Sequence, residues 1–118
     1  ELSDWGTFGV PASPRVLWCG VQGEMGRLHD LQQAVCGATG PLGFKEEERE
    51  YKPHITIARK YRGDMPFPAE RLQTMRKSDR EAGEVIDKRD WTVGALVLFA
   101  TRMHQNPMYE TVENIAFF

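Results

Sequence analysis

The chain has 118 residues, of which 41% are hydrophobic and 27% are charged. This composition is typical of one small globular domain and excludes long disorder or a fibrous repeat. The 15 basic and 17 acidic residues give a net charge of −2, which excludes a globally basic nucleic-acid coat but allows a local basic patch. Cys19 and Cys36 lack metal-ligand spacing and are expected to be reduced. No apolar stretch has the length of a membrane span, and the first residues do not form a signal peptide, so a cytoplasmic protein is expected.

The first half of the chain predicts a strand followed by a helix. The apolar run at residues 15–21 is typical of a strand that is buried on both faces, and we expect it to be central in a sheet. Apolar residues then recur every three or four positions, which predicts an amphipathic helix over 24–38. These residues are Met25, Leu28, Leu31 and Val35. Gly37, Gly40 and Pro41 are expected to stop the helix.

A charged connection leads to a second strand. Residues 45–50 are all charged, so we expect a solvated loop or a strand edge without chemistry. Residues 51–60 predict a strand. Pro53 has no amide donor, which favours the first residue of a strand or an edge position.

The second half predicts a turn at 62–68, a helix over 69–77 and a polar surface loop over 78–90 that can serve as a lid. Residues 91–101 are apolar on both faces of an extended chain, which favours another central strand. A turn at Asn106-Pro107 precedes a final strand over 109–118. The order of elements predicts a single α+β domain over 1–118, with helices packed outside mostly antiparallel sheets.

The sequence Pro-His-Ile-Thr-Ile-Ala-Arg at residues 53–59 is the most informative segment. On a strand, His54 and Thr56 share one face, while Ile55 and Ile57 take the other. Two residues advance the chain by about 6.5–7 Å, so one phosphate group fits between the imidazole and the hydroxyl. The alternative is a half-buried strand whose His and Thr side chains only hydrogen-bond their neighbours.

These stretches, in this order, resemble the 2H phosphoesterases, and specifically the RNA 2′,3′-cyclic phosphodiesterases that are also called 2′-5′ RNA ligases. Residues 6–9 and 14–18 resemble the family's approach to its middle strand, and residues 49–59 resemble its second His-x-Thr-x segment. Residues 93–99 and 107–117 resemble its closing strands. The resemblance implies a bilobed fold with pseudo-twofold symmetry.

The family carries two His-x-Thr-x motifs, one in each half of that fold, and this sequence has one. His29 and His104 are not followed two residues later by Thr, and we expect both to be surface residues. The resemblance therefore implies the middle and C-terminal part of such an enzyme, lacking the N-terminal segment that carries the first motif.

The resemblance also implies the chemistry. Two histidines open a 2′,3′-cyclic phosphate to a 2′-phosphate without a metal or cofactor, and histidine suits both acid and base roles near neutral pH. By resemblance, His54 is one of this pair and Thr56 donates its hydroxyl to a phosphate oxygen. Arg59 is a candidate phosphate clamp, although regular alternation places it opposite His54 unless a bulge redirects it. Arg15 and Tyr109 are weaker substrate-binding candidates.

Three hypotheses about activity follow. In the first, the chain is part of a phosphoesterase that acts on RNA ends or small cyclic nucleotides, and the missing segment supplies the second histidine. Alternatively, it is a phosphate- or RNA-end-binding module that is catalytically incomplete. In the third, two copies of His54 meet in a homodimer. We expect Trp18 and Trp91 to lie in the core, and Phe8 is near enough to a loop to stack on a nucleobase.

Overall fold

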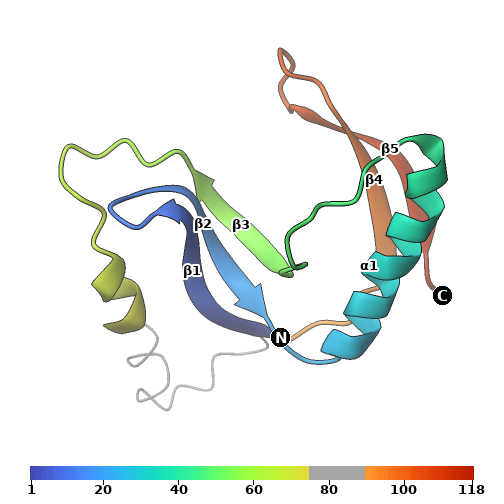
Figure 1. Cartoon of the computed structure of the whole chain (residues 1–118), viewed down its shortest axis with the longest axis horizontal. Helices are drawn as coiled ribbons and strands as arrows, with labels where there is room; N and C mark the ends of the chain where they lie inside the picture. Colours follow the sequence, from blue (N-terminus) through green and yellow to red (C-terminus); the bar gives the residue numbers. More distant parts are fainter. Residues whose placement is uncertain (75–89) are drawn as a thin grey trace.

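The computed structural model describes residues 1–74 and 90–118 and has the α+β architecture with antiparallel sheets that the sequence predicted (Figure 1). Its elements are β1 (Leu2–Val10), β2 (Ser13–Val21), α1 (Met25–Thr39), the short 3-10 helix η1 (Gly40–Leu42), β3 (His54–Arg59), β4 (Ala95–Thr101) and β5 (Tyr109–Ala116). Residues 69–74 are also helical. The rest of the helix predicted over 69–77, and most of the loop predicted over 78–90, lie outside the described residues.

Strands β1, β2 and β3 form an antiparallel sheet in that order, with β2 in the centre as predicted. The apolar sequence of β2 explains its place, because a central strand can bury side chains on both of its faces. Trp18 on one face is 9% exposed and Cys19 on the other is 4% exposed. Strand β3 is an edge strand that begins directly after Pro53, in agreement with the missing amide donor of proline.

Helix α1 follows strand β2 in the chain, and each of its ends lies within one residue of the predicted range. Its apolar stripe is half-buried, and the opposite side is exposed. The helix runs through Gly37, so the prediction that this residue helps to stop it is wrong. It ends at Thr39, where Pro41 enters the 3-10 turn of η1 and Gly43 adopts a φ of +95°. A glycine inside a helix lowers its stability without ending it, whereas proline removes an amide donor.

We expect Gly37→Ala to stabilise the protein by about 0.5–1 kcal/mol, because alanine loses less backbone entropy than glycine when a helix forms. Apart from its chain neighbours and the backbone of its own helix, no atom of the described residues lies within 4 Å of the position that the added Cβ would take, so we expect no packing cost. A higher urea midpoint with an unchanged slope would check this expectation, and an unchanged or lower midpoint would contradict it.

Strands β4 and β5 form a separate antiparallel hairpin. The prediction that residues 91–101 make a central strand is wrong for the described residues, because β4 pairs there with β5 alone. Apolar side chains of both strands are exposed, and they are Leu98, Phe99, Tyr109, Val112 and Ile115. Trp91 precedes the hairpin and is 50% exposed, so the expected core position is wrong for this residue. A long apolar run indicates burial only when another layer covers it.

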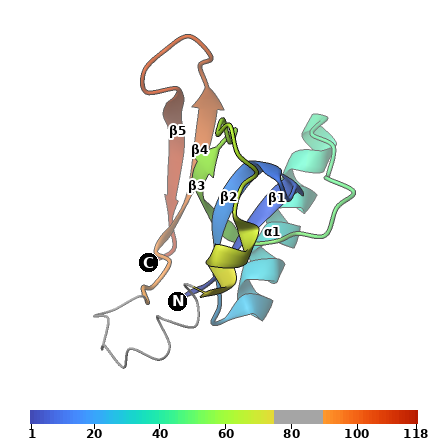
Figure 2. The same ribbon diagram turned by 90° about the vertical axis from the view of Figure 1, so that its left-hand side faces the viewer.

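The three-stranded sheet, α1 and the hairpin make no close backbone contact with one another within the described residues. Figure 1 shows the three-stranded sheet at one end of the molecule, with α1 and the β4–β5 hairpin toward the other end, and Figure 2 shows that the hairpin and α1 are themselves apart. The radius of gyration is 17.1 Å, whereas a compact domain of this length would have about 13–14 Å. The described residues include no helix that is both long and apolar enough to span a membrane.

Candidate functional site

Strand β3 presents His54 and Thr56 on one face of the three-stranded sheet. His54 lies opposite Gly20 of β2, and Thr56 lies opposite Trp18. Ile55 lies opposite Cys19 and therefore belongs to the other face. The period of two that the sequence predicted for this segment is confirmed between residues 54 and 56.

A bulge in β3 then changes the alternation. Thr56 pairs with Trp18 and Ala58 pairs with Leu17, so Ile57 is an extra residue without a partner on β2. Arg59 consequently lies opposite Val16. Because Val16 and Trp18 are two positions apart on β2, Arg59 shares the face of His54 and Thr56. The sequence allowed Arg59 at this face only if such a bulge existed.

The His54 imidazole is held by the chain that precedes it. Its Nδ1 lies 2.6 Å from the carbonyl oxygen of Lys52. A carbonyl oxygen only accepts hydrogen bonds, so Nδ1 donates and carries a proton. This hydrogen bond leaves the other ring nitrogen, Nε2, as the one that can interact with a ligand.

Two aromatic rings lie beside this imidazole. The Phe8 ring meets it edge to face at 5.1 Å between centroids, and the Trp18 ring is tilted to it at 6.3 Å. Phe8 and Trp18 also contact each other at 5.4 Å. The Trp18 indole lies across Gly6 of β1, where any Cβ would overlap its six-membered ring. The absence of a side chain at Gly6 thus permits the packing that supports His54.

A cation completes this group of side chains. The Lys52 ammonium lies 4.9 Å from the centroid of the Trp18 ring, within the range of a cation–π contact. Lys52 therefore contacts the site twice, through its carbonyl oxygen and through its side chain. Neither this residue nor the Phe8 contact with His54 was predicted, because both contacts depend on pairing between strands that are distant in the sequence.

Of the two weaker substrate-binding candidates, Arg15 lies in the sheet of His54 and Tyr109 does not. Arg15 lies in the same sheet, at the end where β3 leaves it, and its carbonyl oxygen accepts a 2.9 Å hydrogen bond from the amide of Lys60. Its side chain crosses Gly9 of β1. Tyr109 is on β5, against Phe99 at 6.2 Å, and the described residues do not bring this strand to the sheet of His54. Its substrate-binding role remains a prediction.

The other two histidines are exposed, as predicted. His29 is on α1, where Nδ1 lies 2.9 Å from the Met25 carbonyl oxygen and the ring meets Tyr51 edge to face. His104 is in the turn after β4. Neither lies on the face of His54 in the part of the chain that the structure describes.

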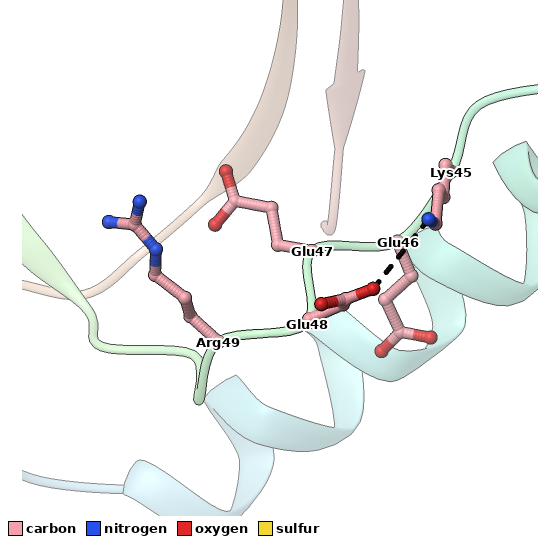
Figure 3. A pocket seen from close by; sticks show the side chains of 5 residues that line it. All are labelled: Lys45, Glu46, Glu47, Glu48 and Arg49. Carbon is pink, nitrogen blue, oxygen red and sulfur yellow. Dashed lines mark ion pairs between the residues drawn. The ribbon is translucent and has the colours of Figure 1, made fainter.

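The charged loop before β3 encloses a shallow surface hollow (Figure 3). Its side chains are exposed, and the Lys45 ammonium pairs with the Glu48 carboxylate at 3.6 Å. The prediction of a solvated loop is confirmed. We assign no chemistry to this hollow.

The donors on the His54 face are available to an anion. Within residues 1–74 and 90–118, the Thr56 hydroxyl has no hydrogen-bond partner, and Arg59 forms no ion pair with a carboxylate. The same residues contain no group of three or more His, Cys, Asp or Glu side chains that can hold a metal ion. An imidazole, a hydroxyl and a guanidinium on one face are suited to binding a phosphate group.

Comparison with known proteins decides the family. Residues 1–104 match the model of the 2′-5′ RNA ligase superfamily. The chain belongs to this superfamily. The resemblance to 2H phosphoesterases is thereby confirmed, and the match includes β1, β2, α1, β3 and β4.

Curated members of the superfamily are similar over almost the whole chain. An RNA 2′,3′-cyclic phosphodiesterase of Geobacillus stearothermophilus is 38% identical over 111 residues, which is 94% of this chain and 32% of that protein. Proteins with the same name are 32% identical in Aeropyrum pernix, over 98% of this chain and 62% of the relative, and 34% identical in Bacillus subtilis, over 89% and 51%. The chain thus spans about a third to three-fifths of the length of these relatives. No solved structure gave a significant match.

Proposed function

We propose that this superfamily member forms part of a metal-independent phosphodiesterase that opens 2′,3′-cyclic phosphates, on RNA ends or nucleotides, to 2′-phosphates. The observation that carries the proposal is that the bulge at Ile57 brings Arg59 to the face that His54 and Thr56 already share. The names of the curated relatives support the substrate class.

In the proposed reaction each of these residues has a part. A water oxygen forms a bond to phosphorus, the bond from phosphorus to the ribose 3′ oxygen breaks, and the phosphate stays on the 2′ oxygen. The Thr56 hydroxyl and the Arg59 guanidinium donate hydrogen bonds to the phosphate oxygens, where negative charge accumulates. These interactions stabilise the transition state more than the ground state.

His54 exchanges one proton in this scheme, and it does so through Nε2. When the imidazole is neutral, Nε2 accepts a proton from the attacking water; when it is charged, Nε2 donates a proton to the departing 3′ oxygen. The hydrogen bond from Nδ1 to the Lys52 carbonyl fixes the ring for both roles. The complementary proton transfer is assigned to a second histidine, supplied by an N-terminal segment of a longer protein or by a partner copy.

A second candidate function is a phosphate- or RNA-end-binding module. The observation that favours it is that the described residues place His54 on this face without a second imidazole. Such a module would hold the cyclic phosphate with the same three donors and would not turn it over.

Hydrolysis of a 2′,3′-cyclic mononucleotide by the 118-residue chain, with EDTA present, tests the two functions. If a partner copy supplies the second histidine, we expect turnover by this chain, with a 2′-phosphate as the product, identified by chromatography. If an N-terminal segment supplies it, we expect the same product only from a longer protein that carries that segment. Binding of the cyclic nucleotide without turnover by either protein would favour the module. A 3′-phosphate product, or activity that EDTA abolishes, would contradict the proposed reaction.

The oligomeric state distinguishes the two sources of the second histidine. If the chain is active, sedimentation should show a dimer, because a monomer does not bring two copies of His54 together. An active monomer would contradict the requirement for a second histidine.

A further inference from the structure

The side chain of Lys52 has no part in the reaction proposed above, yet this residue contacts two members of the site. Its carbonyl oxygen accepts the hydrogen bond from His54, and its ammonium lies on the Trp18 ring. Among the described residues, no carboxylate forms an ion pair with this ammonium. The charge is therefore held over the Trp18 ring, which itself lies beside the imidazole, and is free to meet an anion.

Lys52 and Arg59 lie on opposite sides of the His54–Thr56 pair. Lys52 comes two residues before His54, and Arg59 follows Thr56 across the bulge. If a cyclic phosphate binds between the imidazole and the hydroxyl, the guanidinium of Arg59 can contact it from the side of Thr56. The Lys52 ammonium, on the side of His54, is then left for another group of the same ligand.

The surrounding segment has the charge of a polyanion-binding surface. Residues 49–62 include Arg49, Lys52, Arg59, Lys60 and Arg62, and the single acidic residue among them is Glu50. This concentration contrasts with the net charge of −2 for the whole chain. Because β3 is an edge strand and most of its residues are exposed, an extended ligand can reach this segment.

We propose that Lys52 is a specificity-determining residue that binds the phosphate on the 5′ side of the nucleotide bearing the cyclic phosphate. A mononucleotide has no such phosphate, whereas the end of an RNA chain has one. The site therefore selects RNA ends over free cyclic nucleotides. The Trp18 ring restrains the ammonium before the ligand arrives, which reduces the entropy lost on binding. This inference rests on the proposed function and names its preferred substrate.

Binding of two product-like ligands tests the inference without requiring turnover. One ligand is a short RNA with a terminal 2′-phosphate, and the other is a nucleoside 2′-phosphate. We expect Lys52→Met to weaken binding of the RNA about tenfold, which is the loss for one hydrogen bond to a charged group. The preference for the RNA over the mononucleotide should fall by the same factor. Methionine keeps an unbranched apolar stem to pack on Trp18.

The salt dependence gives a readout that a purely structural role would not change. The slope of log K against log salt concentration for the RNA should become less steep by about 0.7, the value for one contact to a single-stranded backbone phosphate. Lys52→Arg should restore most of the slope. Lys45→Met is the matched control, since Lys45 pairs with Glu48 in the exposed loop, and it should retain the wild-type slope.

An unchanged slope in Lys52→Met, or an equal loss of affinity for both ligands, would overturn the inference. Equal losses would mean that Lys52 acts by positioning His54. The proposed function fails separately: if the wild-type chain binds the RNA in a Lys52-dependent way but neither it nor the longer protein hydrolyses a cyclic phosphate, the RNA contact is supported and the catalytic proposal is not.

Discussion

Replacement of His54 by alanine should lower kcat/KM for a 2′,3′-cyclic nucleotide by about 10²–10⁴-fold, the usual loss when a general acid or base is removed. The structure supports this expectation through the restrained imidazole, whose Nδ1 donates to the Lys52 carbonyl and whose Nε2 remains available. Thr56 and Arg59 would still bind the phosphate, so kcat should fall more than the affinity. Steady-state kinetics on the variant and the wild-type protein would measure both effects.

The matched control for this prediction is His29→Ala. His29 is exposed on α1 and bonds to a carbonyl of its own helix, so its loss should change kcat/KM by less than about twofold. Equal losses in the two variants would argue that His54 has no special role. Thermal unfolding of His54→Ala should accompany the kinetics, because the variant also loses the edge contact with Phe8.

Gly6→Ala should destabilise the protein by about 1–3 kcal/mol, the cost of forcing extra volume into a packed site. The added methyl group would overlap the Trp18 indole, and among the described residues Trp18 is the one large side chain that is buried. The ring must move, which also disturbs its contact with His54. Urea unfolding would give the loss of stability, and kcat/KM should fall in the same variant.

Gly37→Ala is the control for this substitution, because it adds the same methyl group where no side chain of the described residues lies within 4 Å. The two changes should shift the urea midpoint in opposite directions. A midpoint for Gly6→Ala at or above that of the wild-type protein would show that the indole can move without cost. The support of His54 by Trp18 would then have to be abandoned.

Periodicity predicted the elements whose burial follows from local sequence. Strand β2 and helix α1 were found because their apolar residues recur with the spacing of a central strand and of an amphipathic helix. The same reasoning was wrong for β4 as a central strand and for Trp91 as a core residue. An apolar run shows what a segment can bury, but the layer that covers it lies elsewhere in the chain.

The candidate site was likewise predictable only where it depends on local sequence. The positions of His54 and Thr56 on one face needed only the period of a strand. The position of Arg59 needed the bulge, and the contacts of Lys52 and Phe8 needed the register of three strands. Register depends on hydrogen bonds between distant segments, and no local pattern in residues 53–59 contains that information.

Because Ile57 has no partner on β2, the face on which Arg59 lies depends on how many residues separate it from His54, and not on the side chain at position 57. In a regular strand, a residue five positions after His54 would lie on the opposite face. The bulged residue Ile57 does not count in the pairing, so Arg59 has the register of a residue four positions away. Many side chains can fill a looped-out position that makes no pair. A deletion at this point would reverse the side on which the guanidinium emerges, although every functional residue would still be present. The number of residues between His54 and Arg59 therefore matters to this face as much as the identity of either residue.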